Sequence, residues 1–386
     1  WRAGLSCLLA MSGCSSGGSS GEVGTLNVLL TDAPACGFDH VYVTVDHVEI
    51  STDGGTWTTV PVKSTLSRID LLTLRNGTLL SLGSVPLSAG TYQQVRLVLK
   101  DNGASAPWAN ALVLTGSTSE LPLKTPSGQQ SGYKLQAHFD VAANQVADMV
   151  LDFDACKSIV RAGNSGRFNL KPVVAVTKRL TTQIEGYVDP AIASSVVVST
   201  RDPDNQLRAT VPDSSTGKFV IAYLPENTRY TVVVSGTGRT TTAITGVPVS
   251  TAIGSTRLNT PASPIAPQVS PTAQVMGLVS DTSNAALTEA SVNAQQTLST
   301  LQTLDVAWGN VDPANASYTL TLPLTAPQKA SYVAQDGPLN FSADSVAPNR
   351  YQVFGSATGY TTQTTDPAVT LGAADSTVTK NLMLAP

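Results

Sequence analysis

The sequence predicts an all-β protein with a sandwich-like N-terminal domain and two further β-sandwich modules. Thr, Ser, Val, Gly and Pro dominate the composition and only 4 methionines occur, a balance that favours strands and turns over helices. Apolar residues alternate with polar ones along many segments, which is the period of a half-buried strand. Pairs such as Asp-Gly and Asn-Gly separate these segments, as they do in β-hairpins.

The length and the charge of the chain limit its class. With 386 residues the chain is too long for one ordinary hydrophobic core, which predicts two or three domains. Only 13% of the residues are charged and the net charge is -4, so no nucleic-acid partner is predicted. After residue 13 no apolar run reaches the length of about 20 residues that a membrane-spanning helix needs.

The N-terminal residues resemble the signal of a bacterial lipoprotein. An apolar run over residues 5–11 leads into Ser12-Gly13-Cys14 and then into a stretch rich in Ser and Gly. This order resembles a lipobox. The resemblance implies that residues 1–13 are a signal peptide without its beginning, and that residues 14–24 are a lipidated cysteine with a flexible tether.

Lipidation of Cys14 would make a membrane the first partner of the protein. The bacterial modification, as the resemblance implies, adds more than one acyl chain, palmitate among them, and several chains bind a bilayer firmly. Ser15 follows the cysteine instead of Asp, which predicts an extracytoplasmic protein at the outer membrane or cell surface of a Gram-negative bacterium. The alternative is a disordered leader in which the cysteine is incidental.

Cys36 and Cys156 are expected to form a disulfide bond. Cys7 lies in the predicted signal and Cys14 is the lipidation site, so these two cysteines remain in the exported chain. A bond across so long a loop contributes roughly 4–5 kcal/mol on the chain-entropy model. The alternative is a pair of buried free thiols. A redox site is not predicted, because no Cys-x-x-Cys spacing occurs.

Residues 25–178 form one predicted β domain. The apolar series changes phase between Val45 and Val48, which predicts a β-bulge near Asp46-His47. Hairpin turns are expected at Asp53-Gly54-Gly55 and over residues 75–78. The predicted strands lie within residues 26–30, 41–50, 92–99, 135–139, 146–153 and 168–176.

This segment resembles the family called domain of unknown function 4382. The resemblance extends over residues 25–178 and implies a β-rich extracytoplasmic domain that often occurs in lipoproteins. The family has no established activity. The residues that carry the resemblance include Leu30–Pro34, Ile69–Leu72, Gly90–Leu97, Leu151–Asp154 and Leu170–Pro172.

The rest of the chain contains two loosely similar units, over residues 180–259 and 273–386. The segment Gln183–Val188 is echoed by Gln274–Val279, near the start of each unit. Residues 260–272 are rich in proline and are expected to be a semi-rigid linker. The repetition predicts two duplicated β-sandwiches of the immunoglobulin-like or prealbumin-like kind.

The first unit also resembles the carboxypeptidase regulatory-like, transthyretin-type sandwich. Thr216–Phe219, Leu224-Pro225 and Tyr230–Val232 match the usual run of that family, whereas the second unit has a longer insert before Tyr351. The same broad fold group includes starch-binding modules. Carbohydrate binding is therefore a hypothesis that rests only on the similarity of this unit's fold to starch-binding modules.

Three pairs of residues are candidate sites, each with a structural alternative. His40 and His47 flank a strand, and the predicted bulge would let them share a metal ion; the alternative is surface polarity. Asp152 and Asp154 share a strand face and offer oxygen ligands to calcium, although structural salt bridges are favoured. Trp57 and Trp108 are candidate sugar-stacking residues; the alternative is packing over the edge of their own domain.

No motif of an enzyme appears, so neither catalysis nor a cofactor is predicted. His-Glu-x-x-His and phosphate-binding glycine loops are absent from the sequence, and Gly-x-Ser-x-Gly occurs only in the Ser/Gly-rich leader over residues 13–21, outside the predicted β domains. The leading interpretation is a lipid-anchored surface protein whose β modules serve binding or adhesion, with a surface glycan or another surface protein as partner. The alternatives are a structural stalk or subunit of an extracellular assembly and, third, a metal-dependent enzyme.

Overall fold

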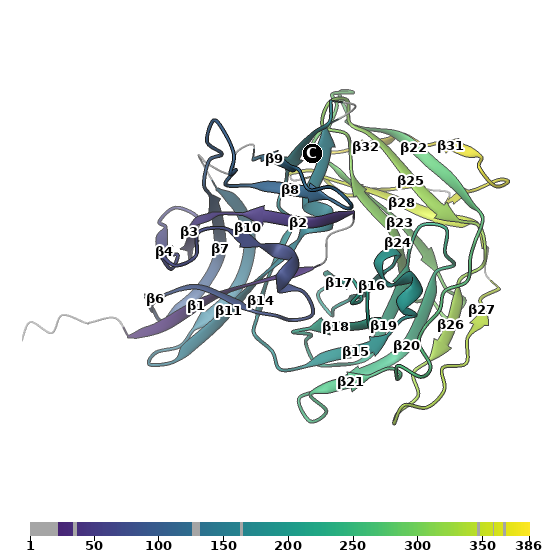
Figure 1. The fold of residues 1–386 in the computed structure, drawn as a ribbon, viewed down its shortest axis with the longest axis horizontal. Helices are drawn as coiled ribbons and strands as arrows, with labels where there is room; N and C mark the ends of the chain where they lie inside the picture. Colours follow the sequence, from purple (N-terminus) through teal and green to yellow (C-terminus); the bar gives the residue numbers. More distant parts are fainter. Residues whose placement is uncertain are drawn as a thin grey trace, which may run out of the picture.

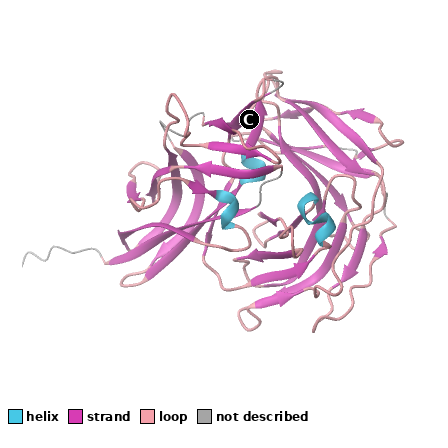
Figure 2. Ribbon diagram, viewed as in Figure 1, coloured by secondary structure: helices cyan, strands magenta, loops and turns pink. Residues whose placement is uncertain are grey.

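The computed structural model confirms the all-β class. It describes residues 22–33, 37–125, 132–162, 165–345, 348–357, 359–365 and 368–386. Strands make up most of this part of the chain, as Figure 2 shows in magenta. Its helical segments are single short turns: η1 (Leu71–Leu74), α1 (Ala155–Ser158) and η2 (Pro190–Ser195).

Three sheets enclose the core of the N-terminal domain. The first has the order β14-β11-β1-β6, the second β10-β7-β3-β4 and the third β12-β13-β9-β8-β2-β5. Strand β1 runs parallel to β11, although more than a hundred residues separate them in the sequence. The bounds are β1 Val23–Ala33, β2 Phe38–Val43, β3 Val45–Ser51, β4 Thr58–Pro61, β5 Ile69–Asp70, β6 Leu80–Ser88, β7 Gly90–Leu99, β8 Ala111–Leu114, β9 Glu120–Lys124, β10 Tyr133–Val141, β11 Val146–Asp154, β12 Ile159–Ala162, β13 Arg167–Leu170 and β14 Val174–Lys178.

The core of this domain follows the predicted alternation. Leu26, Val28 and Leu30 are fully buried on one face of β1, because successive side chains of a strand point to opposite sides. The predicted bulge is confirmed, since the pairing of β3 with β7 shifts by one residue between Val45 and His47. The turn at Asp53-Gly54-Gly55 joins β3 to β4 as predicted.

Two local predictions for this domain are corrected. The predicted hairpin turn over residues 75–78 is preceded by the short helix η1 instead of a strand, because Asp70 caps the backbone N–H of Leu72 and three leucines of η1 are buried. Residues 168–176 form two strands of different sheets, β13 and β14, instead of one. Pro172 separates them, and proline has no N–H to continue a ladder.

The first module, residues 180–259, is a sandwich of two sheets. One sheet has the order β18-β15-β21, and the other has the order β17-β16-β19-β20-β26-β27. Tyr230 and Phe219 are among the largest fully buried side chains between them. The strands from this module are β15 Gln183–Tyr187, β16 Val197–Arg201, β17 Leu207–Thr210, β18 Lys218–Ala222, β19 Asn227–Ser235, β20 Thr242–Val249 and β21 Ser255–Arg257.

The second module, residues 273–386, repeats this plan with more strands. Its sheets have the orders β25-β22-β31, with β32 also paired to β22, and β24-β23-β28-β29, with β30 also paired to β28. Tyr351 is fully buried in the core between them, as Tyr230 is in the core of the first module. The strands are β22 Thr272–Asp281, β23 Ser291–Thr297, β24 Thr303–Asn310, β25 Ser317–Pro323, β28 Arg350–Ser356, β29 Gln363–Thr364, β30 Val369–Thr370, β31 Thr377–Thr379 and β32 Leu382–Leu384.

The insert of the second module completes a sheet of the first module. Strand β26 (Gln328–Ser331) pairs in parallel with β20, and β27 (Ser342–Ala343) pairs with β26. Tyr332, Leu339 and Phe341 of the same insert pack on the first module's core. The two modules therefore share a sheet and are not independent bodies.

The proline-rich segment 260–272 lies against the first module. Ile265 is buried in that module's core, and its N–H donates to the carbonyl of Tyr187. Thr240 and Ser270 form further backbone hydrogen bonds that hold the end of the segment in place. The segment therefore contributes to the core of the first module as well as leading into β22.

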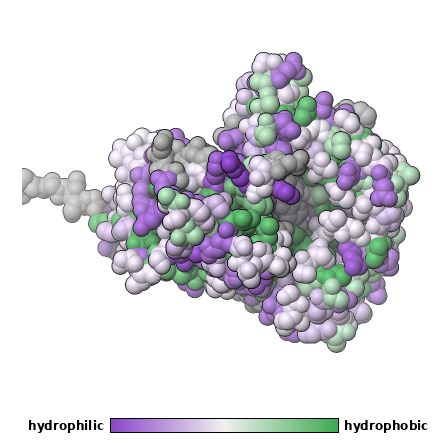
Figure 3. Space-filling model, turned by 45° about the horizontal axis from the view of Figure 1, so that its top comes forward, coloured by the Kyte–Doolittle hydropathy of each residue, from purple (hydrophilic) through white to green (hydrophobic). Residues whose placement is uncertain are grey.

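Each of the three domains contacts the other two. Figure 1 shows the N-terminal domain on the left, the first module at the lower right and the second module at the upper right, around a common centre. On the face seen in Figure 3, hydrophobic residues form separate small groups instead of one broad patch. None of the helices in the described segments is long and apolar enough to span a membrane.

Candidate functional site

A group of acidic residues lies where the N-terminal domain meets the first module. The parallel register sets Thr31 of β1 opposite Asp152 of β11 and Ala33 opposite Asp154, with Asp32 between them. Asp32 is buried; its Oδ1 accepts the backbone N–H of Ala155 at 3.2 Å, whereas its Oδ2 has no hydrogen-bond partner among the described residues. Burial first, and then the charges of Asp154 and Asp152, raise the pKa of Asp32 well above its usual value.

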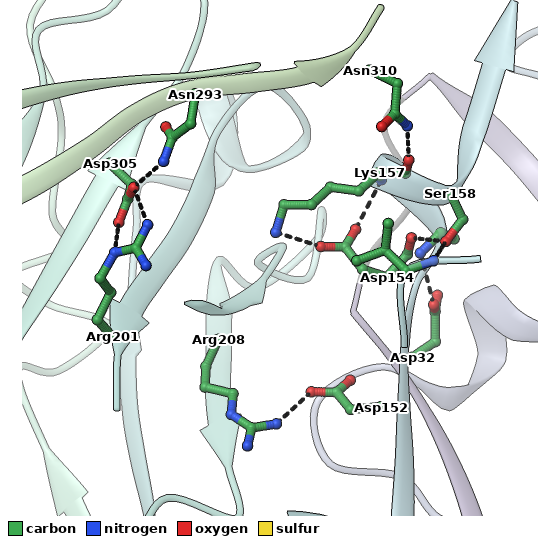
Figure 4. A network of polar contacts seen from close by, with 12 residues as sticks. Asp32, Asp152, Asp154, Lys157, Ser158, Arg201, Arg208, Asn293, Asp305 and Asn310 are labelled. Carbon is green, nitrogen blue, oxygen red and sulfur yellow. Dashed lines mark hydrogen bonds and ion pairs between the residues drawn. The ribbon is translucent and has the colours of Figure 1, made fainter. Parts of the chain in front are cut away.

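Arg208 of β17 reaches this acidic group from the first module (Figure 4). Its Nη1 lies 3.6 Å from Oδ2 of Asp152, and its Nε donates to Oδ2 of Asp202 at 3.2 Å. Burial raises the pKa of Asp152 to about 6, against the opposing effect of Arg208. A cavity of about 20 Å³ beside these groups has room for about one water molecule.

Asp154, the last residue of β11, holds Lys157, and Lys157 contacts the second module. Its Oδ1 accepts the backbone N–H of Lys157 at 3.0 Å as the cap of α1, and its Oδ2 pairs with Nζ of Lys157 at 2.8 Å. That ammonium lies 4.7 Å from the ring centre of Trp308 in β24, and Asn310 donates to the carbonyl of Lys157. One helical turn of the N-terminal domain thus binds two residues of the second module.

The predicted turn over residues 75–78 inserts into the first module. The turn exists, with positive φ at Asn76 (56°) and Gly77 (78°), but it joins η1 to β6 and is not the predicted hairpin, because no paired strands flank it. Oδ1 of Asn76 accepts the N–H of Val220 at 3.3 Å, and the hydroxyl of Tyr223 donates to the carbonyl of Gly77 at 2.5 Å. The turn therefore joins two domains as well as two elements.

An ion pair with a buried carboxylate joins the two modules. Nε and Nη2 of Arg201 lie 2.7 Å from the two carboxylate oxygens of Asp305, which also accepts Asn293 at 2.6 Å (Figure 4). Burial opposes ionisation of Asp305, but the hydrogen bonds from Arg201 and Asn293 outweigh it and lower its pKa. This two-pronged geometry is the stronger form of an Arg–carboxylate pair.

The structure gives His40 and His47 separate partners. Nδ1 of His40 lies 2.7 Å from Oδ2 of Asp70, and its ring stacks on Tyr42 at 5.4 Å. Nδ1 of His47 lies 2.7 Å from Oδ2 of the neighbouring Asp46. The bulge exists but does not join the two rings in a metal site, because His40 lies in β2 and His47 in β3, which belong to different sheets. No group of three or more His, Cys, Asp or Glu in the described segments is arranged to hold a metal ion.

Asp152 and Asp154 form the salt bridges that the sequence favours over calcium. The partner of Asp154 is Lys157, three residues along the chain. The partner of Asp152 is Arg208 in another domain, which the sequence does not indicate.

The structure shows a covered ring face for Trp57 and gives no ring contact for Trp108 among the described residues. The guanidinium of Arg96 lies 3.7 Å above the ring centre of Trp57, and the indole Nε1 of Trp57 donates to the carbonyl of Gly54 at 3.2 Å. Trp57 thus packs on its own hairpin. Trp108 is half-buried next to the cis peptide bond between Ala106 and Pro107.

The predicted cysteine chemistry falls mainly outside the described residues. Cys14 and Cys36 lie outside them, and so does the side chain of Cys156, whose backbone is in α1. Lipidation and the disulfide bond therefore stay predictions.

Sequence reasoning missed the residues that join the domains, above all Arg201, Arg208 and Asp305. One signal was present for two of them: charged residues are rare in this chain, and Arg208 and Asp305 each lie within a strand between apolar neighbours, whereas Arg201 lies between Thr200 and Asp202. Such a charge is buried only when it is paired. The ion pairs of Arg201, Arg208 and Asp305 can hold the domains together. These three residues do not include a nucleophile with a neighbouring base.

Three solved structures resemble the chain at low similarity. The Bacillus anthracis TIE protein matches at 11% identity and a TM-score of 0.20 over 95% of this chain, which spans about half (51%) of that protein. BcpA, the major pilin subunit of Bacillus cereus, matches at 10% identity and a TM-score of 0.18, over 94% of this chain and 99% of that one. The Corynebacterium diphtheriae major pilin SpaA matches at 11% identity and a TM-score of 0.20, over 94% and 100%. At these TM-scores the overall arrangement of this chain differs from those of the three proteins.

No curated protein matches the chain. Residues 23–172, in contrast, match the family described as Domain of unknown function (DUF4382), which confirms the resemblance of the N-terminal domain.

Proposed function

We propose that this protein is a lipid-anchored, extracytoplasmic surface protein that binds or adheres without catalysis. The observation that carries the proposal is that paired charges and shared strands lock the three domains to one another. The ion pairs Arg208–Asp152 and Arg201–Asp305 cross two different domain boundaries, and β26 adds a strand across one of them. A rigid body of this kind presents a fixed surface, which lowers the entropic cost of binding a partner.

The anchor is the second part of the proposal. The signal-like residues up to Ser12-Gly13-Cys14 precede β1, so a lipid on Cys14 would hold the N-terminal domain nearest to the membrane. The outer membrane of a Gram-negative cell is the proposed location. The alternative of an extended stalk has less support, because each domain packs on the other two instead of forming a row.

Two measurements test the proposal in the native host. Metabolic labelling with an alkynyl palmitate should mark the wild-type protein and leave the Cys14→Ser variant unmarked, and the variant should move from the membrane to the soluble fraction. A deletion strain should attach less well to surfaces or to other cells, and the wild-type gene should restore attachment. Unlabelled wild-type protein would overturn the anchor, whereas normal attachment of the deletion strain would overturn the binding role.

A further inference from the structure

A cavity of about 490 Å³ lies between the N-terminal domain and the second module. This volume falls within the range of about 300–1,000 Å³ that small-molecule sites occupy. The cavity is built from both domains, so its shape depends on their contact. Nζ of Lys171 fixes that contact by donating to the carbonyl of Thr288 at 2.5 Å.

One wall of the cavity is a row of three polar side chains on neighbouring strands. Ser291 of β23 is paired with Asn310 of β24 on one side and with Ser356 of β28 on the other. Directly paired residues point to the same face of a sheet and lie about 4.5–5.5 Å apart. The hydroxyls of Ser291 and Ser356 are 2.8 Å apart. The second module therefore offers the cavity an ordered line of hydrogen-bonding groups.

The N-terminal domain supplies the opposite wall. Lys171 has three N–H donors, of which one is used by Thr288, and burial lowers its pKa. Tyr133 adds an aromatic ring whose hydroxyl donates to the carbonyl of Leu170 at 3.1 Å. Glu289 brings a carboxylate from the second module to the rim. The lining thus combines donors, acceptors and one aromatic face.

We infer that this cavity binds a sugar residue of a glycan, an inference that rests on the proposed binding role and names its ligand class. Sugar hydroxyls donate and accept at once, which matches serine hydroxyls, an amide, an ammonium and a carboxylate. An apolar ligand would leave the two remaining N–H donors of Lys171 and the unused hydrogen-bonding positions of the serine hydroxyls without partners, at a cost in free energy. The carboxylate of Glu289 disfavours a phosphate-bearing ligand.

Saturation-transfer NMR on the mature chain tests the site with free sugars: a neutral hexose, an N-acetylhexosamine and a hexuronic acid. Lys171→Met and Ser291→Ala should each weaken binding of the preferred sugar by about tenfold, the effect of one lost hydrogen bond to a charged or buried group. Lys63→Met and Ser342→Ala are matched controls at exposed positions outside the cavity and should leave binding unchanged. Glu289→Gln changes an exposed side chain, so this variant should fold normally. It should still weaken sugar binding, because it removes the carboxylate at the rim. It therefore tests the site even where Lys171→Met impairs folding.

The results of these experiments distinguish failure of the proposed sugar site from failure of the proposed binding role. Sugar binding that all three cavity variants leave unchanged would overturn this site and keep the binding role. An absence of saturation transfer with every sugar would overturn the sugar assignment, and a loss of attachment in the deletion strain would still support the binding role.

Discussion

Arg208 of the first module forms an ion pair across a domain boundary with Asp152 of β11, at 3.6 Å between Nη1 and Oδ2. The same guanidinium holds Asp202 of its own module at 3.2 Å, and the side chains of Arg208 and Asp202 are almost fully buried. One cation therefore serves two carboxylates from different domains. Because charges in such a place are tolerated only in pairs, this contact couples the folding of the two domains.

Arg208→Met should strongly destabilise the protein, because it leaves the buried carboxylate of Asp202 and that of Asp152 without their cation. Removal of one partner of a buried pair costs about 3–5 kcal/mol. Urea unfolding followed by circular dichroism measures the loss. Arg229→Met, at an exposed position, is the matched control and should change stability little. Equal effects of the two substitutions would contradict the role of Arg208.

The raised pKa of Asp152 should make the protein less stable as the pH rises from about 4 to about 6. The folded-state pKa is about 6, whereas the carboxyl group of an unfolded chain titrates near 3.9, so the folded protein holds a proton that the unfolded chain has lost. Stability falls with pH wherever the folded state binds more protons. Asp32, whose pKa is also raised, acts with the same sign.

Asp152→Asn should flatten this pH dependence without removing it, because Asp32 still titrates. The measurement is the free energy of unfolding at several pH values for the wild type, Asp152→Asn and the exposed control Asp101→Asn. A variant with Asn at 152 and an unchanged slope would show that Asp152 titrates normally in the folded state.

Gly77→Ala should destabilise the contact between the N-terminal domain and the first module. Gly77 has a φ of 78°, and a Cβ at this position would lie 3.0 Å from the Cβ of Ala222 in the other domain. Gly166→Ala provides a matched control, since Gly166 has a φ of 69° and nothing within 4 Å of the added Cβ. Both variants should lose about 1 kcal/mol from the backbone alone.

The difference between the two glycine variants measures the docking of the turn. We expect a larger fall in melting temperature for Gly77→Ala than for Gly166→Ala, together with faster proteolysis between the domains. Identical melting temperatures would mean that the turn over residues 75–78 contributes no interdomain packing.

The sequence predicts strands and turns well and the contacts between domains poorly. Alternation identifies Leu26, Val28 and Leu30 as one buried face, because burial follows the two-residue period of a strand. It does not say what covers that face. Arg201 and Asp305 lie 104 residues apart, and the parallel pairing of β20 with β26 joins two modules, so neither leaves a local pattern.

The disulfide bond between Cys36 and Cys156 stays a prediction, because Cys36 and the side chain of Cys156 lie outside the described residues. The parallel register of β1 and β11 ends with Ala33 opposite Asp154, so the chain reaches the two cysteines only three and two residues after a paired position. Asp32 also binds the N–H of Ala155. Because the paired positions Ala33 and Asp154 lie so near the two cysteines in the sequence, the predicted disulfide bond can be tested directly.

The bond should appear in the protein exported from its native host and be absent after reduction. Peptide mapping by mass spectrometry without reductant should find the peptides of Cys36 and Cys156 linked, and reduction should lower stability by roughly 4–5 kcal/mol on the chain-entropy model. Cys156→Ser should unfold at the same denaturant concentration with and without reductant, which separates loss of this bond from other effects of the reagent. Two free thiols in the exported protein would contradict the prediction.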